Sequence, residues 1–302
     1  MSWRVLKFGG TSVTAAPLAA AGIVAAAARE RRVAVVVSAL AGVTDRLVAL
    51  VGRARAGAAD LDDDLAAIGE LHRERARRLN GAAALCRSRF ESELRSLRAA
   101  LAEVRETGSP HAIARALAAG ERLSAPLFAA TLEAVAGRPV EVIDATELLV
   151  AAGSPEEAAP QLEATRQRSR LRLAGCLGPV VVPGFYAGAG DGAPLLLGRG
   201  GSDTSATLLG AALAADRVEI WTDVDGAYDR DPRRFPEARL CPALDFAAAE
   251  ALARSGAKVL HAQAIAPARA AGTPIHLRNT FRPEAPGTVV GPREAVAVRK
   301  AA

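Results

Sequence analysis

Trp3-Arg-Val-Leu-Lys-Phe8, followed at once by Gly9-Gly10, decides the fold of this chain. A short apolar run that ends in glycines is typical of a buried strand that opens into a tight loop. The Ala-rich segment that begins at Pro17 and runs to Arg32 predicts a helix, and Val33-Ala-Val-Val-Val37 predicts a second strand buried on both faces. Strand, helix and strand in this order predict a βαβ unit with parallel strands and a right-handed crossover.

Helices and strands continue to alternate beyond this unit. The sequence predicts helices almost throughout residues 44–136, with breaks near Asp60, Asn80-Gly81, Gly108-Ser-Pro110 and Gly120. It predicts further helices at 154–173, 203–214, 246–255 and 262–271, and strands at 140–143, 180–182, 195–197, 217–221, 274–277 and 288–290. Residues 188–192 predict a hairpin connection and not a dinucleotide-binding loop. The alternation predicts an α/β protein with a mostly parallel sheet covered by helices on both faces.

The composition indicates a soluble globular protein. The chain has 302 residues, of which 50% are hydrophobic, so it can bury a substantial core as one large domain or two closely packed lobes. Charged residues interrupt every apolar stretch before it reaches the roughly 18–20 residues of a membrane-spanning helix. The N-terminus reaches a charge and two glycines too soon for a signal peptide. We therefore predict a cytoplasmic location without membrane contact.

The composition also disfavours several functions. The three cysteines stand far apart and the four histidines form no H-E-x-x-H pair, which argues against a disulfide framework or a transition-metal catalytic site. The net charge is +5, but arginines alternate with acidic residues in segments such as 70–78, as on a solvated helix face. Only 4% of the residues are aromatic, so a base-stacking surface is poorly supported. Nucleic acid is therefore not an expected partner.

Lys7-Phe-Gly-Gly-Thr-Ser12 is the first segment with residues suited to anion binding. A strand delivers a lysine at its carboxyl end, and two glycines then let backbone N–H groups approach a ligand. The Lys7 ammonium is a compact charge suited to phosphate oxygens. The lysine precedes the glycines, which disfavours a conventional P-loop ATPase. On these residues alone, an ordinary turn between strand and helix is an equally good explanation.

A second segment, Leu197-Gly-Arg-Gly-Gly-Ser-Asp-Thr-Ser-Ala206, combines three glycines with an arginine. The guanidinium of Arg199 can grip a carboxylate in two places, and Asp203 can orient a lysine or a metal. Ser202 and Thr204 are expected to cap the helix that follows. A glycine-rich loop with a helix cap is the alternative, but turn chemistry alone does not explain an arginine among three glycines.

Two later segments carry further polar residues. In Trp221–Arg233, a predicted strand ends at Thr222-Asp223, and Asp225-Gly226 is a tight-turn signal. Tyr228 and Arg233 could flank a nucleotide. The segment Ser255-Gly-Ala-Lys-Val-Leu-His261 reads as a helix stop followed by a lysine. Taken singly, each of these segments is better explained as an ordinary loop.

Taken together and in order, the motifs KFGGTSV (7–13), SALAGVTD (38–45), LGRGGSDTSA (197–206), WTDVDGAYDRDPR (221–233) and GAKVLH (256–261) resemble the catalytic domain of aspartate kinases. These enzymes form a branch of the amino acid kinase family, and the resemblance covers residues 4 to about 290. It implies the three-layer αβα sandwich of the carbamate kinase-like type. It also implies an amino-acid-binding lobe at about 1–178 and an ATP-binding lobe at about 179–302.

The resemblance implies transfer of the γ-phosphoryl group of MgATP to the side-chain carboxylate of L-aspartate, giving 4-phospho-L-aspartate. Lysine and threonine biosynthesis is the expected use of this product, and a specialised biosynthetic pathway is the alternative that the sequence leaves open. It implies that Lys7 neutralises phosphate charge, that Asp203 holds the lysine and that Mg²⁺ is carried by ATP. It assigns the acceptor to Ser38, Thr44, Glu121, Arg199 and Ser202. It assigns the nucleotide to Lys7, Gly9, Gly10, Thr11, Ser12, Thr222, Asp223, Tyr228, Arg233, Lys258 and Val259.

Two departures from the family pattern leave alternatives open. The family often has a hydroxyl-bearing or imidazole residue where this chain has Ala119, which favours a kinase of another small carboxylic or amino acid as the alternative. The sequence also ends too soon for ACT regulatory domains, so we expect no inhibition by lysine or threonine through such domains. A homodimer, a separate regulatory subunit, and a catalytically inactive nucleotide-binding subunit are further expectations that the sequence leaves open.

Overall fold

The computed structural model describes residues 2–58, 60–78, 83–230, 234–254 and 260–293. A single eight-stranded sheet runs through this part of the chain, and its neighbouring strands are parallel except for the antiparallel pair β11 and β12. From edge to edge, the strands are β10 (Ala243–Asp245), β12 (Thr288–Gly291), β11 (Ile275–Asn279), β9 (Val218–Thr222), β1 (Trp3–Phe8), β2 (Arg32–Val37), β6 (Val180–Pro183) and β3 (Glu141–Val142).

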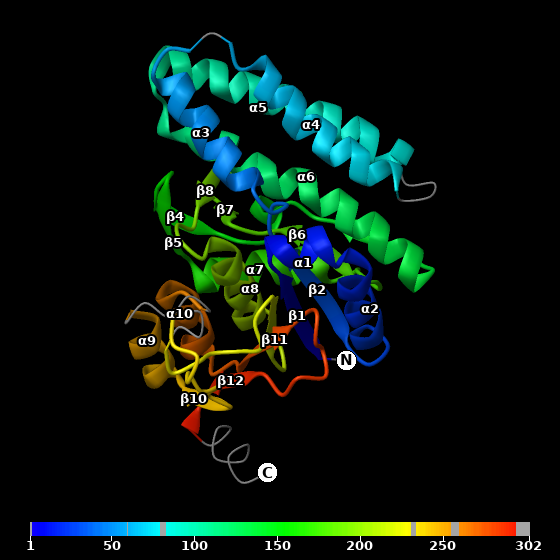
Figure 1. The fold of residues 1–302 in the computed structure, drawn as a ribbon, viewed down its shortest axis with the longest axis vertical. Helices are drawn as coiled ribbons and strands as arrows, with labels where there is room; N and C mark the ends of the chain where they lie inside the picture. Colours follow the sequence, from blue (N-terminus) through cyan, green and yellow to red (C-terminus); the bar gives the residue numbers. More distant parts are fainter. Residues whose placement is uncertain (1, 59, 79–82, 231–233, 255–259, 294–302) are drawn as a thin grey trace.

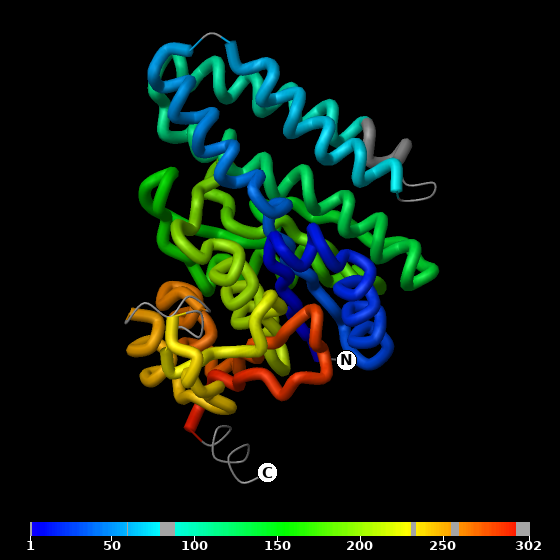
Figure 2. The backbone as a smooth tube through the Cα atoms, viewed as in Figure 1, coloured from blue at the N-terminus to red at the C-terminus, as the bar shows by residue number. Residues whose placement is uncertain are grey.

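Helices cover both faces of this sheet (Figure 1). In chain order they are α1 (Gly10–Ala15), α2 (Pro17–Ala27), α3 (Val43–Arg55), α4 (Asp62–Arg77), α5 (Ala83–Thr107), α6 (Pro110–Ala136), α7 (Leu162–Leu173), α8 (Gly201–Ala212), α9 (Phe246–Arg254) and α10 (Ala262–Ala271). In Figure 1, α3, α4 and α5 form the block at the top, farthest from the sheet, and Figure 2 shows the same path as a tube. None of the described helices combines the length and apolar character that a membrane crossing needs.

Two hydrophobic cores flank the sheet because successive side chains of a strand point to opposite faces. Leu6 and Phe8 of β1 pack in a core with residues of α2, α3 and α6. Val5 of the same strand packs in a second core with residues of α8 and α10. Each central strand is therefore buried on both faces, as its continuous apolar sequence predicts. The result is the predicted three-layer αβα arrangement with a mostly parallel sheet.

One predicted helix is shorter than expected. The sequence predicts a helix at 154–173, but residues 151–160 form a hairpin of β4 (Ala151–Ser154) and β5 (Glu157–Pro160), and α7 begins only at Leu162. Two prolines explain the error, because Pro155 disfavours helical backbone at the residue before it and Pro160 has no N–H group for a hydrogen bond in a helix interior. The connection at 188–192 is the predicted hairpin, between β7 (Tyr186–Gly188) and β8 (Pro194–Leu196).

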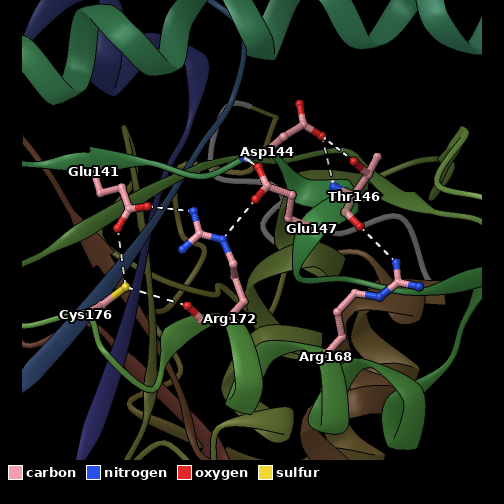
Figure 3. Close-up of polar contacts among 7 residues, drawn as sticks. All are labelled: Glu141, Asp144, Thr146, Glu147, Arg168, Arg172 and Cys176. Carbon is pink, nitrogen blue, oxygen red and sulfur yellow. Dashed lines mark hydrogen bonds and ion pairs between the residues drawn. The ribbon is translucent and has the colours of Figure 1, made fainter.

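Helix α7 is tied to the edge of the sheet by ion pairs and hydrogen bonds (Figure 3). The Arg172 guanidinium bridges the carboxylates of Glu141 and Glu147 at 2.6 and 2.9 Å. Arg168 donates to the backbone carbonyl of Thr146, the middle residue of the 3-10 turn η1 (Ala145–Glu147). Partial burial, reinforced by Glu141, raises the pKa of the Cys176 thiol in this cluster. These contacts fix α7 beside β3 and η1.

The long helix α6 runs without interruption through Gly120, where the sequence predicts a break. The predicted breaks near Asp60 and at Gly108–Pro110 are confirmed, whereas Asn80-Gly81 lies outside the described residues. A glycine occupies this helical position because the packing around it leaves no room for a side chain. A Cβ atom there would lie 2.9 Å from Cβ of Ala39 and 3.1 Å from a methyl group of Leu47. Gly120 therefore lets α6 approach the loop after β2 and helix α3.

We expect Gly120→Ala to lower the free energy of unfolding by ~1–3 kcal/mol, because the added methyl group overpacks this contact. Gly22→Ala is the matched control, since a Cβ atom on Gly22 in helix α2 meets nothing within 4 Å. That variant should gain ~0.5–1 kcal/mol from the better helix propensity of alanine. Urea denaturation measures both values, and equal changes in the two variants would contradict the packing argument.

Candidate functional site

The carboxyl ends of four parallel strands, β9, β1, β2 and β6, meet at one edge of the sheet. Hydrogen bonds between neighbouring strands continue into the loops beyond them. The Gly9 amide donates to the Trp221 carbonyl at 3.2 Å, and the Ser38 amide donates to the Phe8 carbonyl at 3.1 Å. Ligands of open α/β sheets bind outside this edge, at the point where the strand order reverses. Here that point is at β1, because β2 pairs on one side of it and the later strand β9 pairs on the other.

Lys7 and Asp203 form an ion pair at this edge. The Lys7 ammonium lies 2.6 Å from a carboxylate oxygen of Asp203, and only 11% and 14% of the two side chains are exposed. Lys7 is near the end of β1, and Asp203 lies in the first turn of α8, where the helix dipole favours a negative charge. The predicted pairing of Lys7 with Asp203 is therefore present in the structure.

Glu121 of α6 places a third ionisable group near this pair. It is 3% exposed, and burial raises the pKa of its carboxyl group to about 8. Hydrogen bonds from the backbone at Ala39 and at Glu121 itself, and then the charge of Lys7, oppose this rise. The carboxyl oxygen Oε2 makes no hydrogen bond within the described residues. The carboxyl group thus lacks a complete set of hydrogen-bond partners and can pair with a cation when it is ionised.

The loop after β2, which carries Ser38, is held to its neighbours by side-chain hydrogen bonds. The Ser124 hydroxyl of α6 donates to the Ser38 carbonyl at 2.7 Å, and the Ala41 amide donates to the Thr14 hydroxyl at 2.8 Å. Thr44 follows as the second residue of α3 and is half-buried. Because Ser124 is three residues beyond Glu121, one face of α6 positions both the loop and the buried carboxyl group.

The glycine-rich segment turns sharply into α8. Gly200 has φ +67°, and a Cβ atom on it would lie 2.5 Å from Cβ of His261. Arg199 is exposed, and the described residues provide it with no ion pair. The predicted caps by Ser202 and Thr204 are wrong, because α8 begins at Gly201, its N-cap is Gly200, and both side chains already lie inside the helix. The Thr204 hydroxyl instead donates back to the Gly200 carbonyl at 3.2 Å.

The sequence gives no sign of the part that Phe185 plays beside this segment. Phe185 has φ +77°, a left-handed conformation that is a strained outlier for a bulky residue. Its carbonyl accepts a hydrogen bond from the Leu197 amide at 2.9 Å. A Cβ atom on Gly201 would lie 2.7 Å from its ring. Strained backbone of this kind tends to occur at functional sites.

A part of the residues expected to contact a nucleotide lies at the end of β9 and beyond it. Thr222 is half-buried and Asp223 is exposed, with the Thr222 hydroxyl donating to the Asp223 carboxylate at 3.1 Å. Tyr228 is half-buried and forms a backbone bridge with Leu240. The predicted residues Arg233, Lys258 and Val259 lie outside the described residues, so the structure places only part of this set.

Gly9 and the start of helix α1, directly after β1, join the two sides of the site. Gly9 and Gly10 are partly exposed and Thr11 is exposed, whereas Ser12 is fully buried. The Ser12 hydroxyl shares a 2.8 Å hydrogen bond with the Thr280 hydroxyl, so it is used inside the protein. Among the residues that the structure describes, no group of three or more His, Cys, Asp or Glu side chains could hold a metal ion.

Comparison with known proteins identifies the class to which this fold and site belong. Residues 2–279 match the model of the amino acid kinase family. The chain belongs to this family. The structure of carbamate kinase from Giardia lamblia superposes on 96% of the chain with a TM-score of 0.56 at 12% identity, which supports the carbamate kinase-like fold. The predicted fold class is therefore confirmed.

Within the family, the chain is similar to aspartokinases. It is 36% identical over 299 residues to the bifunctional aspartokinase/homoserine dehydrogenase of Haemophilus influenzae, covering 95% of this chain and 36% of that protein. The structure of E. coli aspartokinase III in complex with aspartate and ADP has a TM-score of 0.88 at 33% identity, covering 96% of this chain and 64% of that one. The chain spans about a third to a half of the length of the curated relatives it matches.

Proposed function

We propose that this chain is an aspartate kinase, which transfers the γ-phosphoryl group of ATP to the side-chain carboxylate of L-aspartate. The observation that carries the proposal is the cluster of Lys7, Asp203 and the buried Glu121 at the carboxyl edge of β1. One oxygen of the aspartate side chain forms a bond to the γ-phosphorus while the bond to the bridging oxygen of ADP breaks. The products are 4-phospho-L-aspartate and ADP.

The chemistry of this transfer needs charge neutralisation more than proton removal. A carboxylate is already an anionic nucleophile at neutral pH, so no strong general base is required. Two anions must instead be brought into line against their mutual repulsion, which positioning and fixed positive charge accomplish. Lys7 provides such a charge, and its ion pair with Asp203 restricts where the ammonium can move.

The acceptor is held by groups of opposite charge. The substrate ammonium would pair with Glu121, whose Oε2 has no hydrogen-bond partner among the described residues. Arg199 would bind the substrate α-carboxylate with two parallel hydrogen bonds. Ser38, Thr44 and Ser202 would complete the acceptor site.

The nucleotide would lie against the loops that follow β1 and β9. We assign its contacts to Lys7, Gly9, Gly10, Thr11, Ser12, Thr222, Asp223, Tyr228, Arg233, Lys258 and Val259. Mg²⁺ would arrive with ATP, since this ion keeps several waters and is bound mainly by substrate phosphates with one or two carboxylates. Asp223 is exposed directly after β9 and is a candidate for such a carboxylate.

A hydroxamate-trapping assay with Mg²⁺-ATP and a panel of small acids tests the function. L-aspartate should give the hydroxamate of an acyl phosphate at a rate well above that of other acids. Absence of product with aspartate alone would favour the second candidate, a kinase of another small carboxylic or amino acid. The fully buried Ala119, two residues before Glu121, motivates that candidate because the family often has a polar residue there. ATP binding without turnover of any acid would indicate an inactive subunit.

Arg199→Ala is expected to raise the KM for aspartate by about 10- to 100-fold with a smaller change in kcat, because a bidentate charged contact is lost. Steady-state kinetics with aspartate as the varied substrate measures the change. Arg199→Lys is the matched control, since it keeps the charge but cannot bind the carboxylate in two places. An unchanged KM in Arg199→Ala would remove this residue from the acceptor site.

The remaining expectations stay predictions. They are the division into lobes at about residue 178, the homodimer, a separate regulatory subunit, the cytoplasmic location and a role in lysine and threonine biosynthesis. The eight-stranded sheet is continuous across the predicted lobe boundary, and β6 lies between β2 and β3.

A further inference from the structure

A cavity of about 310 Å³ lies between α1, α2, α6 and the C-terminal end of α4. Its walls are mainly apolar and include Leu40 of the loop after β2 and Leu127 and Phe128 of α6. This volume is within the range of small-molecule sites, which combine apolar walls with a few polar groups that orient the ligand. The proposed acceptor and nucleotide contacts do not use these residues.

Two arginines give this cavity its charge. Arg75 and Arg78, at the end of α4, both line it, and none of the lining residues described is acidic. Arg75 donates from Nη1 to the Thr14 carbonyl at 2.7 Å, but its Nε is buried and has no hydrogen-bond partner. Arg78 pairs with Glu74 on the exposed surface at 2.6 Å. Apolar walls with guanidinium groups at one side suit an amphipathic anion, because a carboxylate can accept hydrogen bonds from both arginines.

The cavity shares two residues with the supports of the proposed acceptor site. Thr14 and Ser124 line it, and the same two side chains hold the loop after β2 through Ala41 and Ser38. A ligand that moved either side chain would displace a loop that leads into Thr44. Direct hydrogen bonds therefore connect residues that line the cavity to the loop that carries Ser38 of the proposed acceptor site.

We propose that this cavity is an effector site for a small amphipathic carboxylate, and that its occupancy changes the affinity for the acceptor. The apolar part of the ligand lies against Leu40, Leu127 and Phe128, and its carboxylate is bound by Arg75 and Arg78. The regulatory half of this inference rests on the proposed function, whereas the binding half does not.

Binding is tested by calorimetry with octanoate, and with octanol as the neutral analogue. Octanoate should bind more tightly than octanol, and Arg75→Gln or Arg78→Gln should weaken octanoate binding at least about tenfold, since a hydrogen bond to a charged group exceeds that free energy. Arg77→Gln is the matched control, because Arg77 pairs with Glu70 and does not line the cavity. Equal binding of octanoate and octanol, or an equal loss in Arg77→Gln, would overturn the site.

A second test leaves the arginines in place, because Arg75 also donates a hydrogen bond to the Thr14 carbonyl and its replacement could disturb the fold there. Ala15 is exposed at the end of α1 and lines the cavity, so Ala15→Trp should obstruct it while the protein stays folded. Circular dichroism and thermal melting check the fold. Octanoate binding that is unchanged in Ala15→Trp would place the ligand elsewhere and overturn the proposal.

Regulation is tested separately from binding. Octanoate should shift the KM for aspartate at least about fivefold, as for a coupling free energy in the usual allosteric range, with a smaller effect on kcat. Arg78→Gln and Ala15→Trp should keep the basal activity and lose the shift. Octanoate binding without any shift would overturn the effector role. A chain that binds octanoate through the arginines but phosphorylates no acid would contradict the proposed function and leave the site standing.

Discussion

Lys7→Ala should lower kcat for phosphoryl transfer by about 100- to 1,000-fold, because it removes a fixed positive charge from the transition state. Lys7 lies at the carboxyl end of β1, where only 11% of its side chain is exposed. In such a partly dry site, charge stabilisation is worth more than in water. Release of ADP at saturating aspartate and ATP measures kcat directly.

The ion pair with Asp203 requires a control for stability. Lys7→Ala leaves the Asp203 carboxylate, 14% exposed, without its cation, and breaking a buried pair in this way is itself destabilising. The double variant Lys7→Ala/Asp203→Asn removes the unpaired charge. If kcat stays low in the double variant while its urea midpoint recovers, the loss is catalytic. Near-normal kcat/KM in both Lys7→Ala and Arg199→Ala would refute the site assignment.

Glu121→Gln should raise the KM for aspartate by about 100-fold, because the buried partner of the substrate ammonium loses its charge. Steady-state kinetics with aspartate as the varied substrate measures this KM. In the free protein, burial raises the pKa of Glu121 to about 8, so the group is mostly protonated at neutral pH. Aspartate must bind to the ionised form. The wild-type KM should therefore fall as pH rises toward about 8 while the substrate ammonium keeps its proton, and Glu121→Gln should lack this dependence.

The raised pKa of Glu121 also makes the free energy of unfolding depend on pH. The folded state binds the Glu121 proton up to about pH 8, whereas the unfolded chain releases it near pH 4.5, the ordinary pKa of a glutamate side chain. The unfolded state thus binds fewer protons between these values, and the wild-type free energy of unfolding falls as pH rises through this window. Relative to wild type, Glu121→Gln should gain a few kcal/mol between about pH 5 and about pH 8. Urea denaturation of both proteins at about pH 5 and about pH 8 tests this. A difference in free energy of unfolding that is the same at the two pH values would contradict the raised pKa.

Several elements of the fold could be predicted from the sequence because their patterns are local. The apolar run Trp3–Phe8, the helix that begins at Pro17 and the strand at 33–37 depend on hydrophobicity and on proline at a helix start. These elements appear as β1, α2 and β2. The errors have local causes too. Pro155 and Pro160 mark the hairpin that replaces the start of a predicted helix.

The sequence by itself determined the alternation of strands and helices, the turns at the carboxyl ends of β1 and β9, and the family. Each of these depends on patterns of residues that are close together in the chain. The tertiary structure alone decided which distant side chains meet. The packing of α8 against β1 brings Asp203 beside Lys7, and the packing of α6 at Gly120 carries Glu121 into the protein. The raised pKa of Glu121 and the strained backbone of Phe185 follow from burial and packing. Such properties depend on contacts between residues far apart in the chain, which no local pattern records.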